Sequence, residues 1–133
     1  MRKIAIALVS AAALLAGPAL EARTKLTPDQ ELAKLLEGRE AGTPRSCISQ
    51  HDARDIRVID GTALVFGWGN TIWVNVPRNA RDVDSDDVLF TRNYGGQFCS
   101  LDIVQTLDRS SHMFNGSISL GEFVPYRRIK AAR

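Results

Sequence analysis

The spacing of hydrophobic and polar positions changes near residue 56 of this 133-residue chain. Leu32, Leu35 and Leu36 recur at helical spacing and form one apolar stripe. From Ile56 onward, short runs rich in β-branched residues are separated by Gly, Asp and Asn, which is typical of strands joined by turns. The pattern predicts one N-terminal amphipathic helix followed by a β-rich region.

The residues at both ends of the leucine stripe predict where the helix begins and ends. Thr27 can cap it, Pro28 suits the first helical position, and Gln30 can complete a capping box. Gly38 provides the left-handed residue that commonly ends a helix. A helix of about ten residues is marginal in water by itself, so we expect it to pack on the rest of the domain.

The next segment predicts a three-stranded meander. Asp60-Gly61 lies between runs 56–59 and 62–66, and such a dipeptide predicts a hairpin with positive φ at both turn residues. Residues 67–70 predict the next reversal, and residues 71–76 alternate until Pro77 ends the strand.

Four aromatic residues are candidates for a ligand-stacking surface: Trp68, Trp73, Tyr94 and Tyr126. Trp73 shares a strand with Ile72 and Val74 but lies on the opposite face. If the aliphatic face is the core, Trp73 is either exposed or covered by the helix.

The C-terminal half predicts three more strands after a polar connection. They cover residues 88–91, 97–107 and 117–124, with a two-residue turn at Asn115-Gly116, a bulge near Gly121 and a frayed basic tail at 127–133. One helix and about six antiparallel strands predict an α+β, mainly β fold, a small curled sheet or partly open barrel with the helix covering one side.

The N-terminus predicts a signal peptide over residues 1–22. Arg2 and Lys3 precede an apolar stretch, 4–16, that ends at Gly17-Pro18. The stretch is shorter than the about 20 residues that a membrane-spanning helix needs. Cleavage after Ala22, or alternatively after Ala19, leaves a single exported domain, 23–133, without a transmembrane segment.

The charge balance argues against nucleic acid as a partner. Loss of the basic and acidic residues of the signal peptide lowers the formal net charge from +2 to +1. Binding to a polyanionic backbone requires a much stronger positive field.

The two cysteines, Cys47 and Cys99, predict a disulfide in an oxidising compartment. The bond would close a loop of 52 positions and stabilise the domain by about 4 kcal/mol in the chain-entropy model. Their wide spacing is unlike the short Cys-x-x-Cys motif of redox enzymes, so we interpret the bond as structural.

Asp82, Asp84 and Asp86 stand at alternate positions, as in calcium-binding loops, and suggest a weakly calcium-stabilised domain as one alternative. However, the sixth position of such a loop is Asp87 rather than Gly, and the twelfth is Asn93 rather than Glu.

His51 and His112 are the only histidines, and His51 precedes Asp52. They suggest a second alternative, a small periplasmic hydrolase that uses either histidine with nearby Asp and Ser residues. No serine lies in a Gly-x-Ser-x-Gly motif, and too few ligands remain for structural zinc. We therefore assign no catalytic residue, cofactor or metal.

Several short motifs are similar to those of a group of small exported Gram-negative bacterial proteins of unknown function. The most specific is Cys99 followed three residues later by Asp102; the others are residues 35–39, Pro44, Cys47-Ile48, 58–63, 87–89 and 120–126. The resemblance implies a periplasmic location. Together these observations predict a non-catalytic binding or envelope-associated domain, whose partner is an envelope protein or a small ligand.

Overall fold

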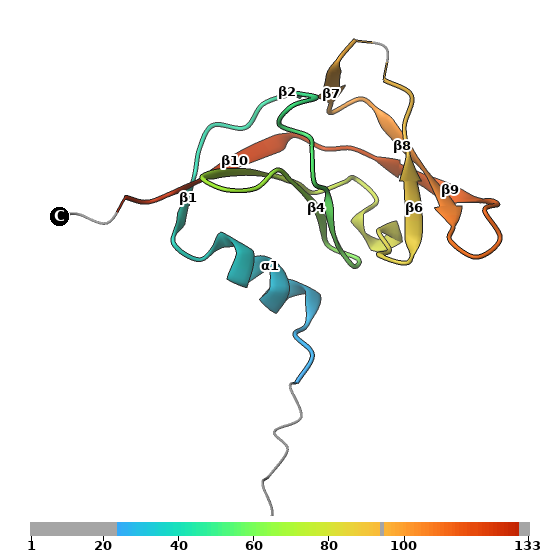
Figure 1. The fold of residues 1–133 in the computed structure, drawn as a ribbon, viewed down its shortest axis with the longest axis horizontal. Coiled ribbons are helices and arrows are strands. Elements are labelled where there is room, and N and C mark those ends of the chain that lie inside the picture. The colour runs from blue at the N-terminus through green and yellow to red at the C-terminus, as the bar shows by residue number, and fades with distance from the viewer. Residues whose placement is uncertain (1–23, 94, 131–133) are drawn as a thin grey trace, which may run out of the picture.

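The computed structural model describes residues 24–93 and 95–130 (Figure 1). These residues form one α-helix, α1 (Pro28–Leu36), a 3-10 turn, η1 (Ala80–Asp82), and ten strands. The strands are β1 (Arg39–Ala41), β2 (Cys47–Ser49), β3 (Arg57–Ile59), β4 (Ala63–Phe66), β5 (Thr71–Asn75), β6 (Asp87–Phe90), β7 (Gln97–Cys99), β8 (Ile103–Asp108), β9 (Phe114–Ser119) and β10 (Phe123–Arg128). The predicted signal peptide, 1–22, and Tyr94 lie outside the described residues.

The strands form three antiparallel sheets. A five-stranded sheet has the order β1-β10-β5-β4-β3, β2 pairs with β7, and the third sheet has the order β6-β8-β9. The five-stranded sheet is open, with β1 and β3 as its edges. The α+β, mainly β fold class is therefore confirmed, although about six strands were predicted and the described residues contain ten.

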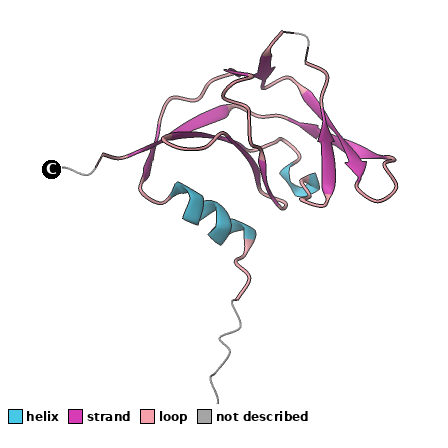
Figure 2. Ribbon diagram, in the orientation of Figure 1, coloured by secondary structure: helices cyan, strands magenta, loops and turns pink. Residues whose placement is uncertain are grey.

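The predicted helix and its capping box are confirmed. Thr27 Oγ1 accepts a hydrogen bond from the Gln30 backbone N–H, 3.3 Å, and Gln30 Oε1 accepts one from the Thr27 N–H, 3.0 Å. Gly38 follows the helix with a φ of +69°. The three leucines of the stripe and Tyr126 pack on one face of the five-stranded sheet, which α1 covers (Figure 2).

The prediction for Trp73 is wrong: its side chain is only 7% exposed, and the helix does not cover it. Trp73 belongs to a second core on the other face of the sheet, with Phe66, Phe123 and Ile118. This core includes residues of the two smaller sheets, so β4 and β5 are buried on both faces. Parallel sheets are usually covered on both faces. An antiparallel sheet commonly has one face in water, so burial of both faces requires a further layer of structure on the second face.

The meander of β3, β4 and β5 is confirmed, but its first turn differs from the prediction. Ile59 pairs with Ala63, so the loop has three residues, and Thr62 N–H donates to the Ile59 carbonyl, 3.0 Å. Positive φ is confined to Gly61, +60°, because the third loop residue removes the need for it at Asp60.

The predicted strand 97–107 is interrupted. Asp102 N–H donates to the Cys99 carbonyl, 2.9 Å, and Asp102 Oδ2 accepts from the Cys99 N–H, 2.7 Å. These two bonds close a turn that ends β7, which pairs with β2, before β8 begins in another sheet.

The predicted turn at Asn115-Gly116 is also wrong, because both residues lie within β9. The β8–β9 register shifts between Thr106 and Leu107, so the irregularity lies inside this ladder rather than at Gly121. The reversal occurs at residues 109–113 instead.

Gly121 marks the point where the chain passes from β9 to β10 and changes sheet. Asn75 is fully buried, and its side chain bonds both backbone groups of Gly121: Nδ2 donates to the carbonyl, 2.7 Å, and Oδ1 accepts from the N–H, 2.9 Å. A Cβ at Gly121 would overlap the carbonyl oxygen of Val76, so only glycine fits.

The basic tail begins later than predicted. Arg127 and Arg128 belong to β10 and pair with Glu40 and Arg39 of β1. The sequence pattern missed β1, and without its partner strand the end of β10 resembles an unpaired tail.

The predicted disulfide between Cys47 and Cys99 is confirmed. The two cysteines are direct partners in the β2–β7 ladder. The bond therefore links the segment that follows β1 to the segment that precedes β8.

Candidate functional site

The turn between β4 and β5, residues 67–70, presents Trp68 to solvent. Gly67 and Gly69 have φ values of +79° and +82°, which other residues adopt with strain. The Trp68 side chain is 74% exposed. An exposed aromatic ring on a constrained turn offers a large apolar surface with a polar N–H for contact with a partner.

Arginine side chains hold this turn, which we name the Trp68 turn. Arg39 Nη2 donates to the Gly69 carbonyl, 2.8 Å, and its Nη1 to the Asn70 carbonyl, 3.0 Å. Arg57 Nη2 donates to the Gly67 carbonyl, 3.3 Å. Arg128 Nε donates to Gly69, 3.3 Å. The backbone of the turn is thus held before any ligand arrives, which reduces the backbone entropy lost on binding.

A pocket of about 210 Å³ adjoins the turn. It is lined by His51, Asp52, Arg54, Gly67, Trp68, Thr71 and Trp73. Its volume is below the roughly 300–1,000 Å³ of pockets for drug-sized ligands. It therefore suits one small group, with an aromatic wall for stacking and polar groups for hydrogen bonds.

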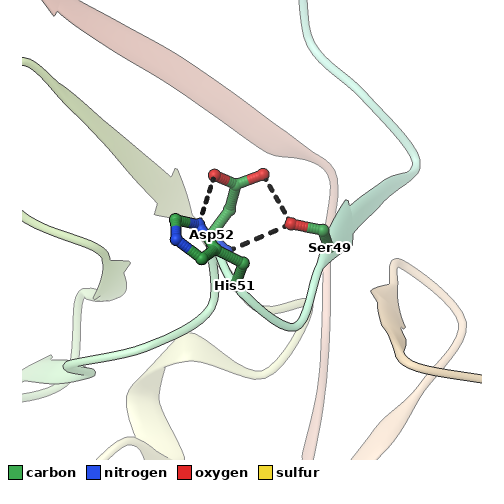
Figure 3. Close-up of polar contacts among 3 residues, drawn as sticks. All are labelled: Ser49, His51 and Asp52. Carbon is green, nitrogen blue, oxygen red and sulfur yellow. Dashed lines mark hydrogen bonds and ion pairs between the residues drawn. The ribbon is translucent and has the colours of Figure 1, made fainter.

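Figure 3 shows how His51 and Asp52 lie relative to Ser49. Ser49 Oγ donates to Asp52 Oδ2, 2.8 Å, and accepts from the Asp52 N–H, 3.1 Å. His51 Nδ1 is 3.9 Å from Asp52 Oδ1, beyond hydrogen-bond distance. A Ser-His-Asp triad requires the imidazole between the hydroxyl and the carboxylate. Here the carboxylate is in the middle, so these three residues do not have the arrangement of a Ser-His-Asp triad.

His112 lies elsewhere, in the β8–β9 turn, with a φ of +56°. Asp108 Oδ1 in the same turn accepts hydrogen bonds from Ser110 Oγ, 2.6 Å, and Ser111 Oγ, 2.9 Å. The Ser110 hydroxyl, followed by the Ser111 backbone N–H, holds the pKa of the Asp108 carboxyl well below its usual range. Both serines thus bond the carboxylate directly, and the two histidines do not share a site.

Two of the three alternate aspartates, Asp82 and Asp84, use their carboxylates in local turns. Asp82 Oδ2 accepts from Asn79 Nδ2, 2.9 Å, and Asp84 Oδ1 accepts from the Asp86 backbone N–H, 2.8 Å. Throughout residues 24–93 and 95–130, no group of three or more His, Cys, Asp or Glu side chains is arranged to hold a metal ion. The structure does not bring these aspartates together.

The sequence identified Trp68 but missed the arginines that hold its turn. Arg39, Arg57 and Arg128 come from β1, β3 and β10, and no local motif connects them. Burial, followed by the positive charges of Arg128 and Arg57, lowers the pKa of Arg39. Their convergence depends on the β1–β10 pairing.

Searches against known protein families, curated proteins and solved structures found no match to this chain. Within the described part of the chain, no helix has the length and apolar character needed to cross a membrane.

Proposed function

We propose that this protein is a non-catalytic binding domain, exported to the periplasm, that holds a small polar ligand at the Trp68 turn. The observation that carries the proposal is the exposed Trp68 ring on a turn whose backbone is held by three arginines, beside a pocket lined by aromatic and polar residues. Rigid aromatic anchors that are already in place contribute most to binding when a partner covers them.

The export part of the proposal rests on the N-terminal pattern, and the disulfide is consistent with it. Disulfides persist in oxidising compartments and are rare in the cytosol. Mass spectrometry of the protein recovered from a periplasmic fraction tests this part. We expect the chain to begin at Arg23 and to carry no free thiol. A full-length, reduced chain in the cytosolic fraction would refute it.

The binding part is supported by the lack of a working nucleophile–base pair at either histidine. Neither serine cluster has an imidazole between hydroxyl and carboxylate, which is the order that a Ser-His-Asp triad requires. Stacking and hydrogen bonding, by contrast, need only the groups that are present.

A substitution at Trp68 tests the site directly. We expect Trp68→Ala to abolish the binding of a saccharide or short peptide measured by calorimetry, without changing the melting temperature, because the ring is mostly in solvent. Phe114→Ala is the matched control, since Phe114 is also exposed, 64%, but lies in the third sheet. Binding that survives Trp68→Ala would refute the assignment of this site.

A further inference from the structure

The three arginines that hold the Trp68 turn have no carboxylate partner in the described residues. Among the described residues, the ion pair found within 4 Å is that of His51 with Asp52. It forms only when the imidazole is protonated. Arg39, Arg57 and Arg128 donate instead to backbone carbonyls, which carry no net charge.

Three guanidinium groups on one turn attract an anion. Burial, followed by the like charges of Arg128 and Arg57, lowers the pKa of Arg39. The hydrogen bonds to the turn explain the positions of the arginines but do not neutralise them. A bound anionic group would.

Two of the three guanidinium groups still have donors to offer. Arg57 and Arg128 are exposed, and each uses one side-chain nitrogen on the turn, Nη2 and Nε respectively. The remaining N–H groups can bind a carboxylate or phosphate in the planar, two-pronged manner that favours arginine over lysine. Arg39 is half-buried, and both of its Nη atoms are occupied.

We propose that the ligand of the Trp68 turn is an acidic saccharide, with a sugar ring against Trp68 and its anionic group on Arg57 and Arg128. This inference rests on the proposed binding function and adds the charge of the ligand. A sugar ring presents an apolar C–H face to an aromatic ring and hydroxyls at its edge, and the pocket of about 210 Å³ has room for one such unit.

The residues that line the pocket suit the hydroxyl groups of the saccharide rather than its acidic group. Asp52 and Arg54 line the same pocket as Trp68 and offer an acceptor and a donor for hydroxyl groups. Within the pocket the Asp52 carboxylate offsets the attraction of Arg54 for an anion. The acidic group is therefore directed outward, to the arginine side of the turn. The low net charge of the chain favours a small acidic ligand over a long polyanion.

Paired ligands separate the role of charge from that of the ring. We would titrate the full exported domain with oligomers of galacturonate, glucuronate and a hexose phosphate, and with their methyl-esterified or dephosphorylated counterparts, by calorimetry. We expect at least one acidic oligomer to bind about tenfold or more tightly than its neutral counterpart at low salt. Added salt should weaken only the acidic ligand, because the ionic contact is exposed and screened.

Arginine variants locate the anion. Arg57→Gln and Arg128→Gln should each weaken the acidic oligomer about tenfold more than the neutral one, whose own affinity reports any loss of support for the Trp68 turn, while Arg57→Lys restores part of the loss. Arg109→Gln is the matched control, because exposed Arg109 also donates to two backbone carbonyls, of Ser85 and Asp86, away from the turn. Melting temperatures verify that each variant is folded.

The outcomes distinguish the two proposals. If neutral and acidic oligomers bind equally and both lose affinity in Trp68→Ala, the binding function stands and the charge inference fails. If no saccharide responds to Trp68→Ala, both fail. If the domain binds phosphatidylglycerol vesicles through the same arginines but no acidic oligomer, the saccharide inference is overturned in favour of a membrane surface.

Discussion

Replacement of Asn75 by alanine should destabilise the domain more than any other single loss of a polar side chain near the β9–β10 junction. Asn75 is fully buried, and its amide satisfies both the N–H and the carbonyl of Gly121, at 2.9 and 2.7 Å. Truncation leaves two backbone groups without partners at the point where the chain passes between sheets.

The magnitude follows from these two bonds. Each buried backbone group without a partner costs about 1–3 kcal/mol, so we expect a loss of about 3 kcal/mol, with the small cavity adding to it. A domain of this kind has a free energy of unfolding of about 5–15 kcal/mol. The variant should therefore remain folded at 25 °C but lose a large part of that free energy.

Asn79 provides the matched control. Its Nδ2 donates to the Ser117 carbonyl, 2.8 Å, and its Oδ1 accepts from the Ser119 N–H, 2.9 Å, so it bridges the neighbouring backbone in the same manner. It is only half-buried, so water can replace the amide, and Asn79→Ala should cost about 1 kcal/mol.

Equilibrium urea unfolding, followed by tryptophan fluorescence, measures both losses. At a slope of about 1–3 kcal/mol per molar urea, Asn75→Ala should lower the midpoint by at least about 1 M. Equal midpoints for the two alanine variants, with unchanged slopes, would refute the argument that burial of these hydrogen bonds determines their contribution.

Three further predictions concern other parts of the fold. Reduction of Cys47–Cys99 should lower the unfolding free energy by about 4 kcal/mol, seen as a lower melting temperature in dithiothreitol, and an unchanged temperature would contradict it. Gly121→Ala should cost at least about 3 kcal/mol and yield little soluble protein, because its Cβ meets the Val76 backbone; normal yield and stability would contradict it. The Asp108 carboxyl should titrate below the other exposed carboxylates in carbon-detected NMR, since serine hydroxyls and backbone N–H groups lower its pKa. Its contribution to stability is therefore present above its usual pKa and lost as pH falls toward the lowered one; an ordinary titration curve would be the contrary result.

Local signals predicted the helix and the meander because the determinants of both lie within a few residues. Thr27 and Gln30 form the capping box by themselves, and Gly61 and Gly67 set the reversals between β3, β4 and β5. Each signal agrees with the apolar periodicity beside it, and such agreement makes a segment predictable.

Sheet changes were not predictable in the same way. Apolar residues continue through 97–107 and 117–124, so periodicity predicts unbroken strands. The interruption at 100–102 depends on Asp102 bonding the Cys99 backbone, and the passage at Gly121 depends on Asn75, 46 positions away. Strands of three residues, such as β1 and β2, likewise form only because a partner strand lies beside them.

The candidate site was predictable only at Trp68. Its turn was expected from two glycines, but Arg39 and Arg128 reach it from 31 and 59 positions away along the chain. Side chains that support a loop from distant strands leave no local pattern, so their role emerges only from the β1–β10–β5 pairing.

The position of β10 determines when the sheet can be completed. The last strand of the chain lies between β1, the first, and β5, so the first strand has no neighbour until the final residues arrive. A polypeptide emerging residue by residue from a ribosome can pair β3, β4 and β5 early, but it cannot attach β1 to them until β10 has been made, so completion of the sheet depends on a contact between distant parts of the sequence.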